Sequence, residues 1–153
     1  MKVIVLADAS NRGKSSSIKG VAKVFVNKPT CRVVDRTPIS TIDENMIIKT
    51  EQGDLIAFCS GGDDFETVGS NIKYAQENNC NILVSASRSK GRTFNIISDF
   101  MQLNGNAGLI VKAIDFYSAG NFLADNANNH AAVCDLTVQH LERIIEYVMR
   151  SRK

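Results

Sequence analysis

The feature that most constrains the fold of this chain is an unbroken run of apolar residues near its first residue. Lys2–Ala7 contains Val3–Leu6, four consecutive apolar side chains of which three are β-branched. A strand with one exposed face alternates apolar and polar residues, whereas an unbroken run is typical of a strand covered on both faces. Lys2–Ala7 therefore predicts a central strand of a parallel sheet with helices packed on either side.

The remainder of the chain alternates between short apolar runs and segments of helical periodicity. Predicted strands lie at 31–34, 81–85 and 108–114, and predicted helices at 14–26, 65–78, 94–103 and 128–150. Two further apolar runs, 46–49 and 55–59, flank a turn that contains Gly53 and predict a β-hairpin. We therefore expect an α/β fold, a three-layer sandwich around a mostly parallel sheet with one antiparallel hairpin strand.

Length and composition agree with one domain over residues 1–153. The chain is 44% hydrophobic and 22% charged, which is typical of a globular domain. No apolar run reaches the roughly 18 residues of a membrane span, and Met1–Leu6 is too short for a signal peptide. The four cysteines form no Cys-x-x-Cys pair, so we expect free thiols in a reducing compartment. These features predict a cytoplasmic protein without a membrane partner.

The net charge of +2 conceals an uneven distribution along the chain. Residues 1–30 hold six basic side chains and one acidic one, residues 31–87 hold four and nine, and residues 88–153 hold eight and six. A total this small excludes a strongly polybasic nucleic-acid binder, so the sequence carries no strong signal for a nucleic-acid partner. The basic first segment is therefore a local feature.

The residues with the clearest chemistry lie between the first predicted strand and the first predicted helix. Arg12-Gly13-Lys14-Ser15 matches the end of the phosphate-binding pattern G-x-x-x-x-G-K-[ST], which occurs between a strand and a helix. Glycine lets the loop curl so that its N–H groups converge on one point, and the helix contributes its positive end. We expect Lys14 to reach the β- and γ-phosphates and Ser15 to ligate Mg²⁺.

The nucleotide phosphates are expected to contact one continuous stretch of chain. Its residues are Ala9, Ser10, Asn11, Arg12, Gly13, Lys14, Ser15 and Ser16. Asp8 departs from the pattern, because it stands where glycine or alanine is usual and its charge repels phosphate. The loop is then longer than usual, or Asp8 points away, or the ligand carries less charge than a triphosphate. The alternative is an ordinary helix start at which the serines act as N-cap residues.

This stretch, together with the order of elements around it, resembles the P-loop NTPase superfamily, in particular its small GTPase-like and kinase-like domains. Asn11–Ser15, Ser60–Asp63 and Ser85–Gly91 also resemble three blocks of small stand-alone P-loop proteins of bacteria and phages. The superfamily resemblance covers nearly the whole chain as an order of elements, and only its first block is specific. It implies a P-loop fold and a nucleotide ligand. Isolated domains of this kind often self-associate, so a homo-oligomer is a further expectation.

The superfamily also places an acidic residue at the end of a strand, where it holds Mg²⁺ through water. The predicted strand 55–59 ends at Cys59 and Ser60 instead, and the next acids are Asp63 and Asp64 in a glycine-rich loop. We expect Asp63 to lie beside the metal or to position a water, with Asp35 as a weaker candidate. The alternative is that the two aspartates cap the helix that follows.

A basic loop follows the predicted strand 81–85. It carries Arg88, Lys90 and Arg92. Ligands of open α/β sheets bind beyond the carboxyl ends of the strands, so this loop is expected to face the same crevice as Lys14. There Arg88 and Arg92 would stabilise charge on a transferring phosphoryl group; the alternative is a solvated loop. The guanine-specific sequence N-K-x-D is absent, so nothing favours GTP over ATP.

These residues predict a protein that binds a nucleoside triphosphate, ATP or GTP, with Mg²⁺. Hydrolysis or phosphoryl transfer is the expected reaction, with Asp63, Arg88 and Arg92 as catalytic residues and Ser15 and Asp63 as metal ligands. One alternative is a small nucleotide or nucleoside kinase, whose acceptor site would have to lie in residues 115–129. The other is a degenerate P-loop module that binds a phosphate-bearing ligand or a partner protein without turnover.

Overall fold

The computed structural model describes residues 1–9, 13–103, 107–112 and 126–151, in which strands and helices alternate. In chain order the elements are β1 (Lys2–Ala7), α1 (Lys14–Val26), β2 (Cys31–Pro38), β3 (Glu44–Thr50), β4 (Leu55–Cys59), α2 (Phe65–Glu77), β5 (Ile82–Ser87), α3 (Arg92–Leu103), β6 (Ala107–Val111) and α4 (Asn126–Arg150). The predicted alternation of strands and helices is therefore confirmed for these residues.

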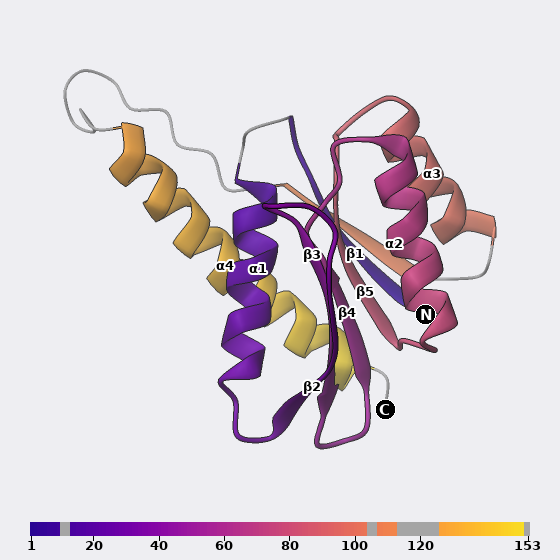
Figure 1. Cartoon of the computed structure of the whole chain (residues 1–153), viewed down its shortest axis with the longest axis vertical. Coiled ribbons are helices and arrows are strands. Elements are labelled where there is room, and N and C mark those ends of the chain that lie inside the picture. Colours follow the sequence, from indigo (N-terminus) through magenta and orange to yellow (C-terminus); the bar gives the residue numbers. More distant parts are fainter. Residues whose placement is uncertain (10–12, 104–106, 113–125, 152–153) are drawn as a thin grey trace.

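The strands of the described residues form one sheet in the order β2-β3-β4-β5-β1-β6. β4, β5, β1 and β6 pair in parallel, whereas β3 runs antiparallel to both of its neighbours. Helices α1 and α4 cover one face of this sheet, and α2 and α3 cover the other (Figure 1). The expected three-layer α/β fold, mostly parallel with one antiparallel hairpin strand, is confirmed.

The position of β1 explains why its sequence is apolar without alternation. Ile4 and Leu6 belong to the buried cluster beneath α1 and α4. Val3 and Val5 belong to the second cluster, beneath α2 and α3. Each of these side chains is at most 1% exposed. Because helices cover both faces of β1, a polar residue at any of these positions would be buried without water.

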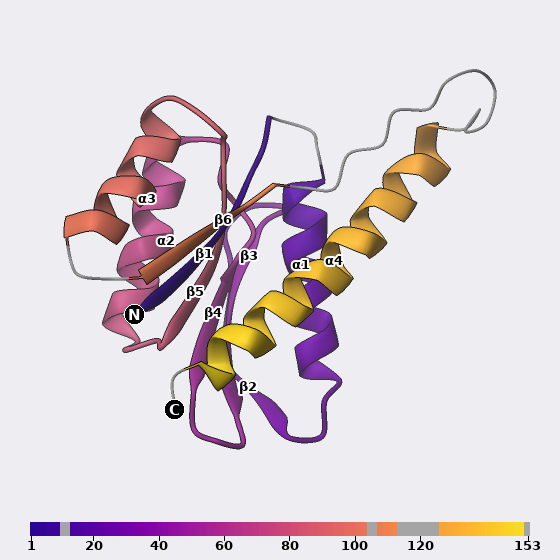
Figure 2. The same cartoon turned by 180° about the vertical axis from the view of Figure 1, so that it is seen from behind.

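Helix α4 packs across α1, as Figure 2 shows from behind. The contact is close at Gly20, where a Cβ atom would lie 2.7 Å from Cγ2 of Val138. Lys28, just beyond α1, adds ion pairs of 2.8 and 2.6 Å to Glu142 and Glu146. These contacts hold α1 and α4 together on one face of the sheet.

One strand is longer than the sequence predicted. The prediction ended the second strand at residue 34 and placed a polar connection up to residue 45, whereas β2 continues to Pro38 and β3 begins at Glu44. β2 is an edge strand with mostly exposed side chains, so hydrophobic periodicity cannot detect its polar half. The Tyr74 hydroxyl on α2 donates a hydrogen bond to Asp35 and holds the pKa of that carboxyl below its ordinary value. Asp35 therefore has a structural partner in α2.

The structure bears on the expectation that the cysteines are free thiols. All four cysteines are free thiols, and burial raises the pKa of Cys80 to about 11 and also raises that of Cys59. Both thiols therefore stay protonated near neutral pH.

Among the described residues, no helix combines the length and the apolarity that crossing a membrane requires.

Candidate phosphate-binding site

The loops after β1 and β5 begin side by side at the carboxyl edge of the sheet. Ala7 is paired with Ser87, and the Asp8 N–H donates to the Ser87 carbonyl at 3.2 Å. The helix that follows β1 lies on one face of the sheet, and the helix that follows β5 lies on the other. Loops that diverge in this way from neighbouring strands form the usual ligand-binding position of open α/β sheets.

Gly13 ends the loop after β1 in a conformation that suits glycine. Its φ of 74° and ψ of 17° are left-handed, and it is the N-cap of α1, where a glycine offers no capping side chain of its own. The Ser17 N–H donates to the Gly13 carbonyl at 2.8 Å, so the helix starts directly after Gly13. The alternative in which the serines cap this helix is therefore wrong, because the serines lie inside the first turn.

Lys14 folds back over the loop that precedes it. Its side chain is only 4% exposed, and Nζ donates to the Ala9 carbonyl at 2.7 Å. Nζ also lies 3.3 Å from Oδ1 of Asp63 on the loop after β4. The structure thus places the Lys14 ammonium between the Ala9 carbonyl and the Asp63 carboxylate. Ser10, Asn11 and Arg12 lie outside the described residues.

Ser15 reaches the end of β4, whereas Ser16 is exposed. The Ser15 hydroxyl donates to the Ser60 carbonyl at 2.9 Å. Because the hydroxyl proton is donated in this bond, the two lone pairs of the Ser15 oxygen remain to act as acceptors. A hydroxyl oriented in this way is a suitable ligand for Mg²⁺.

Asp8 stays at the start of the loop. Its Oδ1 accepts the N–H of Ala9 at 2.7 Å, a local bond typical of aspartate in turns. The carboxylate therefore satisfies one backbone donor of the loop.

Asp63 and Asp64 are adjacent in sequence but have different partners. Asp64 is the N-cap of α2, where its carboxylate accepts the Thr67 N–H at 2.8 Å and the Thr67 hydroxyl at 2.6 Å. These bonds hold the pKa of Asp64 below its ordinary value. Asp63, which is 59% exposed, pairs with Lys14 instead. The capping alternative is therefore correct for Asp64, and the ion pair keeps Asp63 as the site candidate.

We expect Asp64→Ala to lower the free energy of unfolding by about 1 kcal/mol, the usual value of an N-cap. Because the folded-state pKa of Asp64 is lowered, this stabilisation is present above pH 3.8 and is lost as the pH falls through the folded-state value. Urea unfolding of both proteins at pH 7 and pH 3 measures the difference. An equal loss at both pH values would contradict the capping role.

The loop between β4 and α2 is held close to β5. A Cβ atom on Gly62 would lie 2.3 Å from the carbonyl oxygen of Ala86. Nδ2 of Asn71, a buried residue of α2, donates to the Gly61 carbonyl at 2.7 Å. The backbone at Gly61 and Gly62 is therefore close to α2 and β5, and the next residue, Asp63, pairs with Lys14.

An acid that the sequence analysis did not single out also lies at the end of β4. Asp43 directly precedes β3, and its Oδ1 accepts the Ser60 hydroxyl at 3.2 Å. Its side chain lies 3.5 Å from the position of a Cβ atom on Gly61. No local motif surrounds Asp43, and only the pairing of β3 with β4 indicates its position. Among the described residues, no three histidine, cysteine or acidic side chains form a group that could hold a metal by themselves.

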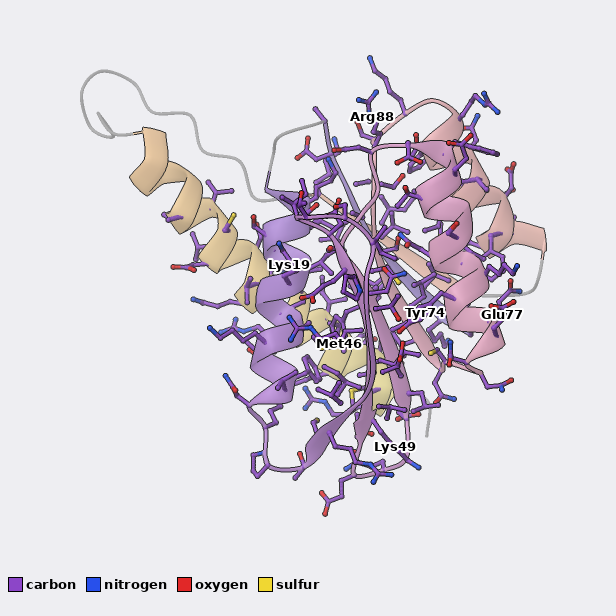
Figure 3. All side chains as sticks on the ribbon, viewed as in Figure 1. Lys19, Met46, Lys49, Tyr74, Glu77 and Arg88 are labelled. Atoms are coloured by element: carbon purple, nitrogen blue, oxygen red, sulfur yellow. The ribbon has the colours of Figure 1, made fainter. Side chains whose placement is uncertain are left out.

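The basic loop after β5 opens at the same edge of the sheet, and Figure 3 shows Arg88 there, at the opposite end of the molecule from Lys49. Arg88 and Lys90 are exposed. The guanidinium of Arg92 lies 4.6 Å from the ring centre of Phe65, the first residue of α2. The structure thus brings Asp63 to Lys14 and places Arg92 against α2.

Comparison of the chain with protein families, with curated proteins and with solved structures finds no match in any of the three. The functional argument therefore rests on the geometry at the carboxyl edge of the sheet.

Proposed function

We propose that this protein binds a nucleoside triphosphate, ATP or GTP, with Mg²⁺ at the amino end of α1. The observation that carries the proposal is the buried Lys14 ammonium, folded back to the Ala9 carbonyl beside a helix start whose N-cap is a glycine. A buried ammonium needs anionic or carbonyl partners, and a glycine N-cap leaves the first N–H groups of the helix without a capping side chain from that residue. This combination of donors suits phosphate oxygens.

In the proposed complex each residue at the edge has a defined part. Gly13 lets the chain turn so that the N–H groups of the first turn face the phosphates. Lys14 contacts the phosphate oxygens after it leaves Asp63. The Ser15 hydroxyl, already oriented by Ser60, fits Mg²⁺, which prefers oxygen ligands and keeps several waters in addition to phosphate oxygens. When bound, Mg²⁺ supplies positive charge that offsets the charge of the phosphates.

Turnover, as hydrolysis or phosphoryl transfer, is the further part of this proposal. Asp63 is 59% exposed and 3.3 Å from Lys14, which suits a carboxylate that orients a water or holds the metal. Arg88 lies on a loop at the same edge and carries a charge that can approach the phosphates. Arg92 would first have to leave the Phe65 ring.

The proposal is tested by the thermal stability of the whole chain with ATP, GTP, ADP and GDP, each with Mg²⁺ and with EDTA. A ligand at about 100 times its Kd adds about 2.7 kcal/mol to the free energy of unfolding. Stabilisation by one of these nucleotides, together with release of phosphate from the triphosphate, is the expected result. No stabilisation by any of the four would overturn the proposal.

One structural observation favours the non-catalytic alternative. Because the Arg92 guanidinium stacks on Phe65, it contacts α2 in this structure. Stabilisation by a nucleotide without any phosphate release would therefore identify a binding module. The kinase alternative depends on residues 115–129, most of which lie outside the described residues.

A further inference from the structure

We propose that Asp43 supplies the metal-side carboxylate at the end of β4, in place of an acid in β4 itself. This inference rests on the proposed nucleotide function and assigns a role to a residue in a different loop. It concerns the position beside Ser15, where β4 ends in Cys59 and Ser60 without an acid of its own.

The pairing of β3 with β4 brings Asp43 to this position. Asn45 is opposite Cys59, and the Ser60 N–H donates to the Glu44 carbonyl at 3.1 Å. The residue before Glu44 must therefore lie beside the chain that continues from Ser60. The Asp43 side chain lies 3.5 Å from the position that a Cβ atom on Gly61 would take, which agrees with this register.

Ser60 connects Asp43 with the phosphate-binding loop. Its carbonyl accepts the Ser15 hydroxyl at 2.9 Å, and its own hydroxyl donates to Oδ1 of Asp43 at 3.2 Å. The same hydroxyl oxygen accepts the Glu44 N–H at 2.9 Å, which fixes its orientation. Ser60 is 1% exposed, so the residue that joins these bonds is buried.

The turn that carries Asp43 is itself well ordered by hydrogen bonds. The N–H groups of Ile39 and Ser40 donate to the Asp43 carbonyl, and the Ser40 hydroxyl accepts the Asp43 N–H at 3.0 Å. Lys19 on α1 donates to the Ile42 carbonyl at 2.6 Å. The turn is therefore linked by this hydrogen bond to the helix that carries Ser15.

Charge distinguishes Asp43 from its neighbour. The Glu44 carboxylate is paired with Arg36, at 2.7 Å between Nε and Oε2. Asp43 instead accepts a hydrogen bond from the neutral hydroxyl of Ser60, the residue whose carbonyl accepts the Ser15 hydroxyl. A carboxylate that contacts Mg²⁺ through its waters suits this position, because Mg²⁺ gives up its waters reluctantly.

The inference is tested by binding of Mn²⁺ to the complex of the whole chain with ADP, with free Mn²⁺ measured by electron paramagnetic resonance. We expect Asp43→Asn to weaken Mn²⁺ binding about 10- to 100-fold, the usual effect of removing an outer-sphere partner of a metal site. Asparagine retains the acceptor for the Ser60 hydroxyl, so the hydrogen-bonded turn is preserved. Asp99→Asn, the same change at an exposed position of α3, should leave Mn²⁺ binding unchanged.

ADP binding in EDTA separates the possible failures. If Asp43 acts through the metal, Asp43→Asn binds ADP in EDTA as tightly as the unsubstituted protein or more tightly. Loss of that binding would show that Asp43 supports the loop itself and would overturn the inference. Mn²⁺ binding within twofold of the unsubstituted protein would overturn it too. If the unsubstituted protein binds none of ATP, GTP, ADP and GDP under both conditions, the proposed function fails, and the inference with it.

Discussion

Lys14→Ala is expected to remove most of the nucleotide affinity while leaving the fold intact. Removing one partner of a buried charged contact costs about 2–5 kcal/mol, so Kd should rise roughly 30-fold or more. At a nucleotide concentration of about 100 times the original Kd, the stabilisation should fall from about 2.7 kcal/mol to less than about 1 kcal/mol. Thermal unfolding with and without nucleotide measures both values.

The fold should tolerate this change because the carboxylate that pairs with Lys14 can be solvated by water when the ammonium is removed. Asp63 is 59% exposed and becomes solvated when the ion pair is lost. Lys23→Ala, on the exposed side of the same helix, is the matched control and should leave Kd unchanged. Equal Kd values for Lys14→Ala and the control would be incompatible with a phosphate-binding role of Lys14.

Asp63→Asn is expected to have the opposite effect in the absence of metal. The Asp63 carboxylate is paired with the Lys14 ammonium, and a bound phosphate has to displace it from this pair. Removing its charge therefore maintains or increases nucleotide affinity in EDTA, and it reduces the gain in affinity that Mg²⁺ provides. Isothermal titration in EDTA and in Mg²⁺ measures the two quantities separately.

Gly62→Ala should be among the most destabilising single changes in the chain. Its Cβ would lie 2.3 Å from the carbonyl oxygen of Ala86 and 2.4 Å from the carbonyl carbon. β5 lies between β4 and β1 in the sheet, so its backbone cannot move aside, and the loop has to move instead. Overpacking of this kind costs about 1–3 kcal/mol, and displacing the loop also separates Asp63 from Lys14. Nucleotide affinity should change together with stability.

Gly69→Ala on α2 provides the control for this change. Its Cβ would meet only the Cδ1 atom of Ile96 at 3.3 Å, the end of a flexible side chain. Alanine also favours a helix over glycine by about 0.5–1 kcal/mol. Chemical denaturation should therefore show a loss for Gly62→Ala and little change or a gain for Gly69→Ala. A Gly62→Ala protein as stable as the control would contradict the close approach of the loop to β5.

The candidate site was predictable from sequence where its residues are near neighbours in the chain. Gly13, Lys14 and Ser15 are consecutive, and the strand before them and the helix after them follow from local periodicity. The loop of Asp63 was predictable for a similar reason, because two glycines and two acids follow a strand directly. The different roles of Asp63 and Asp64 were not predictable. Both are aspartates with the same chemistry, and only the direction of each side chain makes one a cap of α2 and the other a partner of Lys14.

Asp43 and Ser60 show what local patterns cannot reveal. Asp43 and Ser15 are far apart in the chain and approach each other only through the pairing of β3 with β4 and the packing of α1 on the sheet. A polar residue before a strand is ordinary in any sequence. The strand β2, polar and at the edge of the sheet, was underestimated for a related reason, because exposed positions carry little hydrophobic signal.

By itself, then, the sequence determined the local elements and the position of Gly13, Lys14 and Ser15 between a strand and a helix, because backbone preferences and apolar periodicity act over a few residues. The tertiary structure decided the strand order, and with it which loops meet at one edge. It also decided which acid faces Lys14 and which faces the end of β4. Strand order and the positions of the acids depend on packing and strand register between segments that are distant in the chain. The main contribution to stability there is the burial of apolar side chains on both faces of the sheet.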